Sequence, residues 1–287
     1  MAERIEVLKT YKTYVGGKFP RSESDRTYSV NDSKGRHIAN ACRCTRKDIR
    51  DAALAARSAF GGWSERSAYN RGQILYRIAE MLEGRKSQFA GELELFGTKS
   101  KIAIDEVERS IDRLIYFAGW TDKISQVFGT VNPVASSHFN FSVPEPTGVV
   151  GIIAPDTSPL LSTVSLIAPV IAGGNTSILL APEKNPLAAV SFGEVLHASD
   201  VPGGVVNILT GFRSEMADTL SSHMDVNAIL NAVDNVELKK LVDENASISV
   251  KRVFHYPSKN WNEDRQENPY LVQQFMETKT TWHPVGD

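Results

Sequence analysis

The chain has 287 residues, which is enough for one large domain or two small ones with a sizeable buried core. Its composition, 41% hydrophobic and 23% charged, is that of an ordinary soluble protein. The formal net charge of −2 excludes the basic surface by which proteins bind nucleic acid or anionic membranes. No apolar run is long enough to span a bilayer, and Met1 to Thr10 lacks the hydrophobic centre of a signal peptide. We therefore expect a cytoplasmic protein with no nucleic-acid partner and no membrane partner.

Cys42 and Cys44 are the only cysteines. Residues two apart point to the same face of a strand, so we expect two free structural thiols rather than a disulfide. The histidines are scattered without the spacing of metal ligands, and the sequence predicts no metal site. Four acidic residues on predicted helices are expected on solvated faces: Glu92, Glu94, Asp105 and Glu106.

The chain opens with a predicted edge hairpin. Residues 14–19, followed by 28–31, are rich in β-branched and aromatic side chains, and the glycine pair Gly16 and Gly17 interrupts them and allows a tight turn. Thr45, with Asp48 three residues later, resembles a helix N-cap, and apolar residues then recur at helical spacing. The first helix therefore begins after Thr45.

Two further apolar stripes predict more helices. One runs over 64–97, where Gly84 is expected to divide it in two, and the other over 104–129. Beyond them, apolar and polar residues alternate from Phe139 to Val143, which is typical of a strand with one covered face, here interpreted as a projecting ribbon. The first third of the chain thus predicts packing rather than chemistry.

The middle of the chain alternates between short apolar strands and amphipathic helices. The strands are predicted at 149–154, 177–180, 205–209 and 228–230. The helices between them are predicted at 161–171, 187–197 and 215–222. Such alternation indicates an α/β fold with a Rossmann-like, doubly wound parallel sheet, in which ligands bind at the carboxyl ends of the strands.

After Lys251 the alternation stops. The polar segment 255–268 is predicted to be an extended connection, and Tyr270 to Trp282 a strand with no neighbour in sequence. Its unpaired edge predicts pairing with another subunit. In the alternative, the strand folds back onto the ribbon and the protein stays monomeric.

Three long strings resemble the aldehyde dehydrogenase superfamily. They are Pro144 to Pro155, Leu166 to Thr176 and Val201 to Gly211, with a weaker match at Phe275 to Pro284. The resemblance is strongest to the second half of family 16 aldehyde dehydrogenases, which lacks the nucleophile.

The resemblance implies a division of the chain into two parts. A discontinuous, Rossmann-like nucleotide-binding-type domain is expected at 1–125 and 147–252, with the helical N-terminal segment as part of it. A small β oligomerisation arm is expected at 126–146 and 253–287. The catalytic domain is expected to be absent, because the chain passes almost directly from the sheet to its terminal strand.

The family's oxyanion-binding asparagine follows a proline and a tryptophan. Here the segment after Pro155 places Thr157 where that asparagine belongs, and Asp156 adds a carboxylate that would repel a developing oxyanion. The resemblance therefore implies a degenerate oxyanion site.

The family's nucleotide contacts are also altered. Ala181, before Pro182, replaces a lysine that holds the adenosine ribose, and the segment leaves open whether Glu183 or Lys184 matches the ribose-binding glutamate. The glycine-bearing turn for the pyrophosphate reads, in this chain, Ala232, Val233 and Asp234, which blocks close approach and adds negative charge. We expect no cofactor, or weak dinucleotide binding at a vestigial NAD(P) site.

Neither the family's catalytic cysteine nor the sequence context of its glutamate base occurs in the chain. Cys42 and Cys44 lie too far upstream to replace the nucleophile, so no catalytic residue is predicted. We interpret the protein as an aldehyde dehydrogenase-like pseudoenzyme that forms a homo-oligomer or a complex with a catalytic aldehyde dehydrogenase. Two alternatives are a fragment or subunit of an active NAD(P)-dependent aldehyde dehydrogenase, and a dinucleotide-binding regulator.

Overall fold

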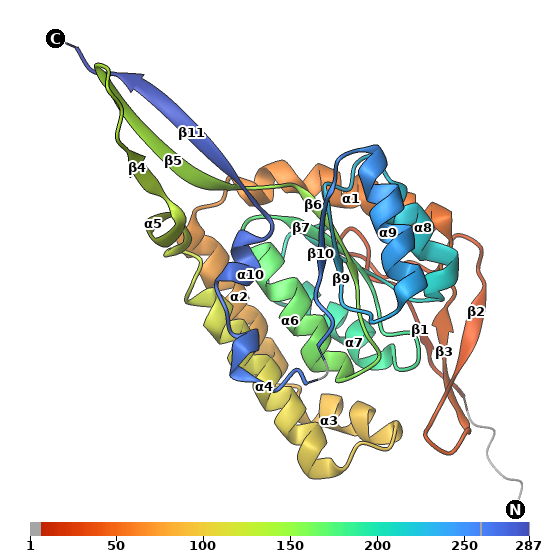
Figure 1. Ribbon diagram of the computed structural model, residues 1–287. Coiled ribbons are helices and arrows are strands. Elements are labelled where there is room, and N and C mark those ends of the chain that lie inside the picture. Colours follow the sequence, from red (N-terminus) through yellow and green to blue (C-terminus); the bar gives the residue numbers. More distant parts are fainter. Residues whose placement is uncertain (1–6, 259, 287) are drawn as a thin grey trace, which may run out of the picture.

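The computed structural model of the protein describes residues 7–258 and 260–286. A five-stranded parallel sheet has helices on both faces, and a narrow antiparallel sheet projects from this body (Figure 1). The predicted α/β fold with a doubly wound parallel sheet is confirmed. Expectations for residues 1–6, 259 and 287 lie outside the described residues.

The central sheet has the order β10-β9-β6-β7-β8. Its strands are β6 (Val149–Ile153), β7 (Thr176–Leu180), β8 (Val206–Leu209), β9 (Ala228–Asn231) and β10 (Arg252–His255). The helices that connect them are α6 (Pro159–Ala172), α7 (Leu187–His197), α8 (Arg213–Ser222) and α9 (Val236–Ile248). All five strands are parallel, so their carboxyl ends share one edge. The chain runs outward from β6 to β8 and then returns to β9 on the other side of β6.

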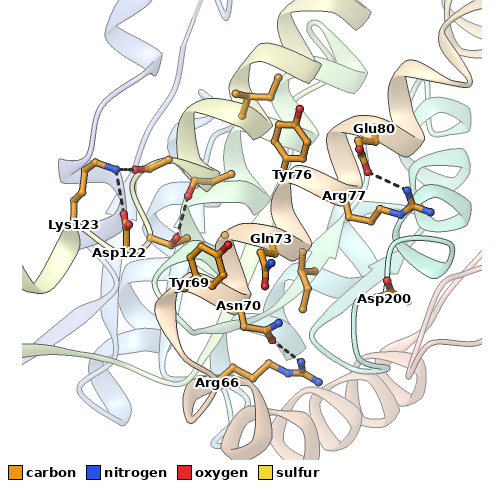
Figure 2. Close-up of a pocket in the computed structure, with 16 residues that line it drawn as sticks. Arg66, Tyr69, Asn70, Gln73, Tyr76, Arg77, Glu80, Asp122, Lys123 and Asp200 are labelled. Atoms are coloured by element: carbon orange, nitrogen blue, oxygen red, sulfur yellow. Dashed lines mark hydrogen bonds and ion pairs between the residues drawn. The ribbon is translucent and has the colours of Figure 1, made fainter.

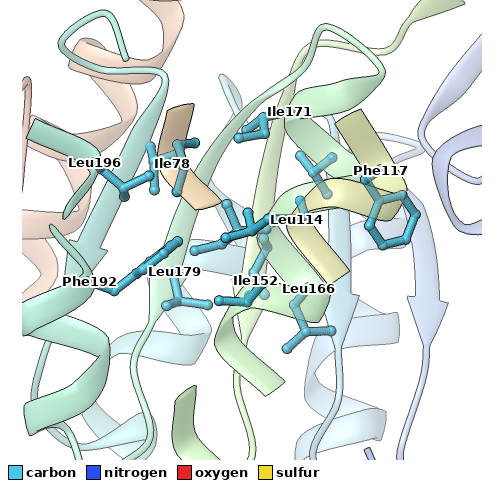
Figure 3. Close-up of a cluster of buried hydrophobic side chains, with 14 of the residues drawn as sticks. Ile78, Leu114, Phe117, Ile152, Leu166, Ile171, Leu179, Phe192 and Leu196 are labelled. Carbon is cyan, nitrogen blue, oxygen red and sulfur yellow. The ribbon is translucent and has the colours of Figure 1, made fainter. Parts of the chain in front are cut away.

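A second helical layer covers the face of the sheet on which α6 and α7 lie. This layer consists of α2 (Ala68–Glu83), α3 (Lys86–Leu95) and α4 (Ser100–Ala118). The other N-terminal helices are α1 (Arg46–Ser64) and the short α5 (Ile124–Phe128). Helix α6 is buried along its whole length between the sheet and α2 and α4. Figure 3 shows part of this core, to which α4 contributes Leu114, α6 contributes Leu166 and β6 contributes Ile152. Helices α1, α8 and α9 cover the opposite face.

The N-terminal helices begin and end largely as predicted. Thr45 caps α1, and its capping box with Asp48 is formed. Gly84 separates α2 from α3. The first hairpin was expected in the wrong place, because residues 14–19 close only a tight turn between Val15 and Lys18. The small sheet that opens the chain is made of β1 (Thr10–Tyr11), β2 (Thr27–Asn31) and β3 (His37–Cys42).

The projecting sheet, called the arm sheet below, has the order β11-β5-β4. Its strands are β4 (Thr130–Asn132), β5 (His138–Pro146) and β11 (Met276–Pro284). β5 confirms the predicted ribbon. The expectation that the terminal strand has no partner within the chain is wrong, because β11 pairs antiparallel with β5 along its full length. This return satisfies the backbone donors and acceptors on one edge of β11, so the terminal strand does not need a second subunit to find a pairing partner.

Two elements near the end of the chain differ from the prediction. Residues Tyr270–Gln273 form a short helix, α10, rather than the start of a strand, since Asn268 accepts a hydrogen bond from the Tyr270 N–H and Pro269 precedes the helix. The strand β10 was missed because it lies at the sheet edge and its four residues are only half-buried. No helix among the described residues is long and apolar enough to cross a membrane.

Candidate functional site

A cavity of about 370 Å³ lies at the carboxyl edge of the central sheet, between α8 and α9. Its apolar wall consists of Val233, Leu238 and Leu241. Its polar rim is formed by five residues: Glu183, Arg213, Ser214, Asn235 and Glu237. An apolar cleft with a few polar groups at this edge of a parallel sheet is the usual form of a small-molecule site.

Asp156, which follows β6, organises the rim of this cavity. Its Oδ1 accepts hydrogen bonds from the backbone N–H of Glu183 at 2.7 Å and of Lys184 at 3.0 Å. Arg213 donates to Asp156 at 2.9 and 3.0 Å. Burial alone would raise the pKa of Asp156, but the bonds from Arg213 and Lys184 outweigh it and lower the pKa. The carboxylate therefore stays ionised and ties together the loops after β6, β7 and β8.

Residues 181–184, which correspond to the family's ribose-binding segment, lie beside the cavity. Ala181 and Pro182 are buried, and the Ala181 N–H continues the sheet by donating to Leu209. Glu183 lines the cavity, whereas Lys184 is exposed and does not. Of the two candidates left open by the sequence, Glu183 is the one whose side chain can meet a ligand in this cavity.

Residues 232–234, which follow β9, were expected to block the approach of the pyrophosphate and to add negative charge. Ala232 is buried and donates to Ile153, while Val233 forms part of the apolar wall. Asp234 is exposed and its carboxylate pairs with Lys239 at 2.6 Å. The Asn235 side chain caps α9. Val233 thus contributes packing surface, and the charge of Asp234 is compensated by a neighbouring cation.

Thr157 does not line the cavity. It is exposed, next to buried Pro155 and to Ser158, which takes a left-handed conformation with φ of 46° at the start of α6. Glu106 of α4 accepts hydrogen bonds from the N–H groups of Leu160 and Leu161 at this helix terminus, at 3.0 and 3.2 Å.

Glu106 and Glu92 are buried, contrary to the expectation of solvated faces. Burial raises the pKa of Glu106, and the N–H groups of Leu161 and Leu160 only partly oppose the rise. Its position among apolar residues on the inner stripe of α4, next to Val107, is the sequence signal that would have identified Glu106.

A larger cavity, of about 810 Å³, lies on the surface of α2 and the end of α4 (Figure 2). Tyr69 and Tyr76 flank Gln73 there. The charged side chains are largely neutralised within the groove by pairs such as Arg77 with Glu80, at 3.0 Å. Its lining comes mostly from α2, the end of α4, the turn after α4 and Asp200, and includes no residue at the carboxyl end of a strand, so the candidate site is the cavity at the sheet edge.

The two thiols are not candidate nucleophiles. Both cysteines are free and buried, as predicted. They lie in the core between α1 and the sheet, and burial raises the pKa of Cys44. Among the described residues no group of three or more His, Cys, Asp or Glu side chains could hold a metal ion.

A family model described as the aldehyde dehydrogenase family matches residues 19–255. The chain belongs to the aldehyde dehydrogenase family. It is 32% identical over 261 residues to the putative aldehyde dehydrogenase DhaS of Bacillus subtilis (strain 168), covering 88% of this chain and 52% of that protein. It is 33% identical to retinal dehydrogenase 2 of Mus musculus, covering 86% of the chain and 48% of that protein. The chain therefore spans about half the length of these curated relatives.

Solved aldehyde dehydrogenases share the fold. An NAD+ complex of the enzyme from Bacillus cereus has a TM-score of 0.82 and 27% identity, covering 86% of this chain and 50% of that one. Betaine aldehyde dehydrogenase from Staphylococcus aureus, also in complex with NAD+, has a TM-score of 0.82 and 26% identity, with the same coverage.

These comparisons overturn the expectation that the chain takes no cofactor. Structural neighbours in the aldehyde dehydrogenase family are NAD+ complexes, which points to NAD(P) binding. The expectation considered Ala181, Val233 and Asp234 one at a time as lost contacts. In the structure, Val233 walls a cavity and Asp234 pairs with Lys239, so neither fills the space at the strand ends.

Proposed function

We propose that the chain is a non-catalytic, NAD(P)-binding member of an aldehyde dehydrogenase assembly. It binds the adenosine part of the dinucleotide in the cavity between α8 and α9, and it joins a second copy or a catalytic aldehyde dehydrogenase through the arm sheet. The proposed division into a nucleotide-binding part and an arm, and a cytoplasmic location, belong to this proposal. The observation that carries it is the short connection between β10 and β11.

This connection leads from the last strand of the sheet straight to the arm sheet. Its described residues, 256–258 and 260–275, form only a 3-10 turn at Asp264–Gln266 and the helix α10. Trp261 of the connection is fully buried, and Arg113 of α4 donates to its carbonyl oxygen. The connection therefore packs onto α4 before the chain enters the arm sheet.

The residues of the cavity fit an adenosine group. The wall of Val233, Leu238 and Leu241 offers an apolar slot for a flat base. The carboxylate of Glu183 at the rim is an acceptor for hydroxyl donors such as those of ribose. Together with the NAD+ complexes among the structural neighbours, these contacts support dinucleotide binding.

This chain has no accessible cysteine to serve as the nucleophile of aldehyde oxidation. Both cysteines are buried in the core, and removing the nucleophile of a well-studied hydrolase lowers kcat roughly a millionfold. Binding of the cofactor without turnover is the consequence we expect.

The arm sheet supports the proposed assembly. It projects from the body (Figure 1), and its outer strands β4 and β11 each have one edge that no described strand pairs with. Val131 is 68% exposed and Phe139 46% exposed on it. Open strand edges beside exposed apolar side chains are typical of surfaces that join subunits.

NADH formation tests the non-catalytic part of this proposal. The purified chain with NAD+ and short or medium aldehydes should produce no NADH above the level of a Cys42→Ser, Cys44→Ser double variant. Turnover that the double variant abolishes would refute the proposal. Turnover that appears only after a separately expressed aldehyde dehydrogenase catalytic domain is added would favour instead a subunit of an active enzyme completed by a second chain.

A further inference from the structure

Three side chains from three neighbouring strand ends meet at the rim of the cavity. They are Asp156 after β6, Glu183 after β7 and Arg213 at the start of α8. The two terminal nitrogens of Arg213 donate to the two oxygens of Asp156, at 2.9 and 3.0 Å. Nη1 also lies 3.3 Å from Oε2 of Glu183. A two-point contact of this kind fixes the plane of the guanidinium as well as its position.

Glu183 is held by this pair in two ways. Its backbone N–H donates to Asp156, and its carboxylate contacts the guanidinium that Asp156 orients. The side chains are only partly accessible, at 14% for Arg213, 25% for Asp156 and 28% for Glu183. Solvent screening of the contacts is therefore reduced, and the short loop after β7 has little freedom to move its carboxylate.

The two oxygens of Glu183 are used differently. Oε2 accepts from Arg213, whereas Oε1 accepts no hydrogen bond from any described residue. Because Glu183 lines the cavity, Oε1 is the oxygen left for a ligand. A carboxylate oxygen held at the polar rim, beside an apolar slot, is suited to accept from the hydroxyls of a sugar whose base occupies that slot.

We propose that Asp156 and Arg213 are positioning residues that hold Glu183 Oε1 in place to accept a hydrogen bond from a ribose hydroxyl of the bound nucleotide. This inference rests on the proposed dinucleotide binding and adds to it the residues that set recognition of the sugar. Arg213 acts through Glu183, and Asp156 acts through both.

A positioning role of the Asp156–Arg213 pair and a purely structural role have different consequences for nucleotide binding. If the pair only stabilised the loops, its loss would weaken binding of every adenine nucleotide to the same extent. If it aims Glu183, its loss removes specifically the preference for a sugar that carries its hydroxyls, because an unheld carboxylate turns toward solvent.

The experiment is a calorimetric titration with AMP, 2′-deoxy-AMP and 3′-deoxy-AMP. The wild-type chain should bind at least one deoxy analogue about tenfold more weakly than AMP, as expected for one hydrogen bond to a charged group. Arg213→Gln and Asp156→Asn should bind AMP about as weakly as that analogue and discriminate less than about twofold. The control is Arg43→Gln, which breaks the ion pair of Arg43 with Glu215. Glu215 lies on α8, as Arg213 does, but neither Arg43 nor Glu215 lines the cavity, so this variant should behave as wild type.

The outcomes separate this inference from the proposed function. If the wild type binds AMP and both variants keep its preference for the full sugar, the positioning role is overturned while nucleotide binding stands. If the wild type binds none of the three, both fall. Should Arg213→Gln fail to fold by circular dichroism, Asp156→Asn decides alone, because its amide oxygen can still accept the two loop N–H groups.

Discussion

Arg113 of α4 donates from Nη2 to the carbonyl oxygen of Trp261 at 3.3 Å, and Trp261 is 1% exposed. The same guanidinium donates to Ser165 of α6 at 2.8 Å and lies 3.5 Å from Glu267. One buried cation thus joins α4, α6 and the connection that leads to the arm sheet. Burial lowers the pKa of Arg113, and the neighbouring Glu267 opposes that shift.

Trp261→Ala should destabilise the chain by about 3–5 kcal/mol, the usual cost of truncating a buried aromatic side chain. Urea denaturation followed by circular dichroism measures it. Tyr69→Ala, at a side chain that is 69% exposed, is the control and should stay within about 0.5 kcal/mol of wild type. If the two variants are equally stable, the packing of Trp261 onto the body does not contribute to the stability of the chain.

Glu106→Gln should change how stability depends on pH. The folded pKa of Glu106 is raised above the ordinary value of 4.5, so between that value and the raised one the folded state binds more protons than the unfolded state. Stability of the wild type therefore falls as pH increases through this window. Glutamine keeps an oxygen that accepts from Leu160 and Leu161 but does not titrate.

The difference in unfolding free energy, variant minus wild type, should accordingly rise with pH above 4.5 and be flat well below it. Denaturation series at several pH values measure this difference. A difference that falls with pH would show that the carboxylate is stabilised as an anion by the terminus of α6.

NADP+ should bind more weakly than NAD+, by about tenfold. Glu183 and Glu237 both line the cavity, while Arg213 is already paired with Asp156 and Glu183. An added 2′-phosphate therefore meets uncompensated negative charge. Parallel titrations of the wild type and Glu183→Gln test this, and the variant should narrow the gap. Tighter binding of NADP+ by the wild type would mean that Arg213 is free to receive the phosphate.

Assembly should depend on the apolar face of the arm sheet. Val131 lies opposite Phe141 in the register, and the rings of Phe139 and Phe141 are 5.5 Å apart, so the three share one face. Val131→Lys with Phe139→Lys should reduce the mass found by light scattering to that of a monomer, whereas Ile248→Lys, on exposed surface of α9, should not. A wild type that is monomeric, both alone and mixed with a catalytic aldehyde dehydrogenase, contradicts the proposed assembly.

Much of the fold could be predicted from the sequence because local signals agree with it. Leu187 to His197 has the bounds that α7 takes, and Thr45 with Asp48 forms the predicted capping box. Where local signals are weak, the prediction failed. The strand β10 lies at the edge of the sheet, and its four residues are only half-buried. Four half-buried residues are too short a pattern to distinguish a strand from a loop in the sequence.

The site could be predicted less well, because it depends on contacts between distant segments. The strand ends and their altered residues were found from the resemblance, but the Asp156 and Arg213 pair spans β6 and α8 and leaves no local pattern. Asp156 was interpreted only as a repulsive charge near Thr157. Its carboxylate instead accepts from Glu183 and Lys184, which the sequence alone does not reveal.

We propose that the adenosine half of the dinucleotide occupies the cavity lined by Glu183 and Val233. Calorimetric titration with NAD+ tests it most directly, with nicotinamide mononucleotide as the matched ligand that lacks the adenosine. The chain should saturate with NAD+ below about 1 mM, equivalent to at least about 4 kcal/mol of binding free energy, and should not saturate with the mononucleotide. Absence of saturation with NAD+, or equal binding of the two ligands, would contradict it.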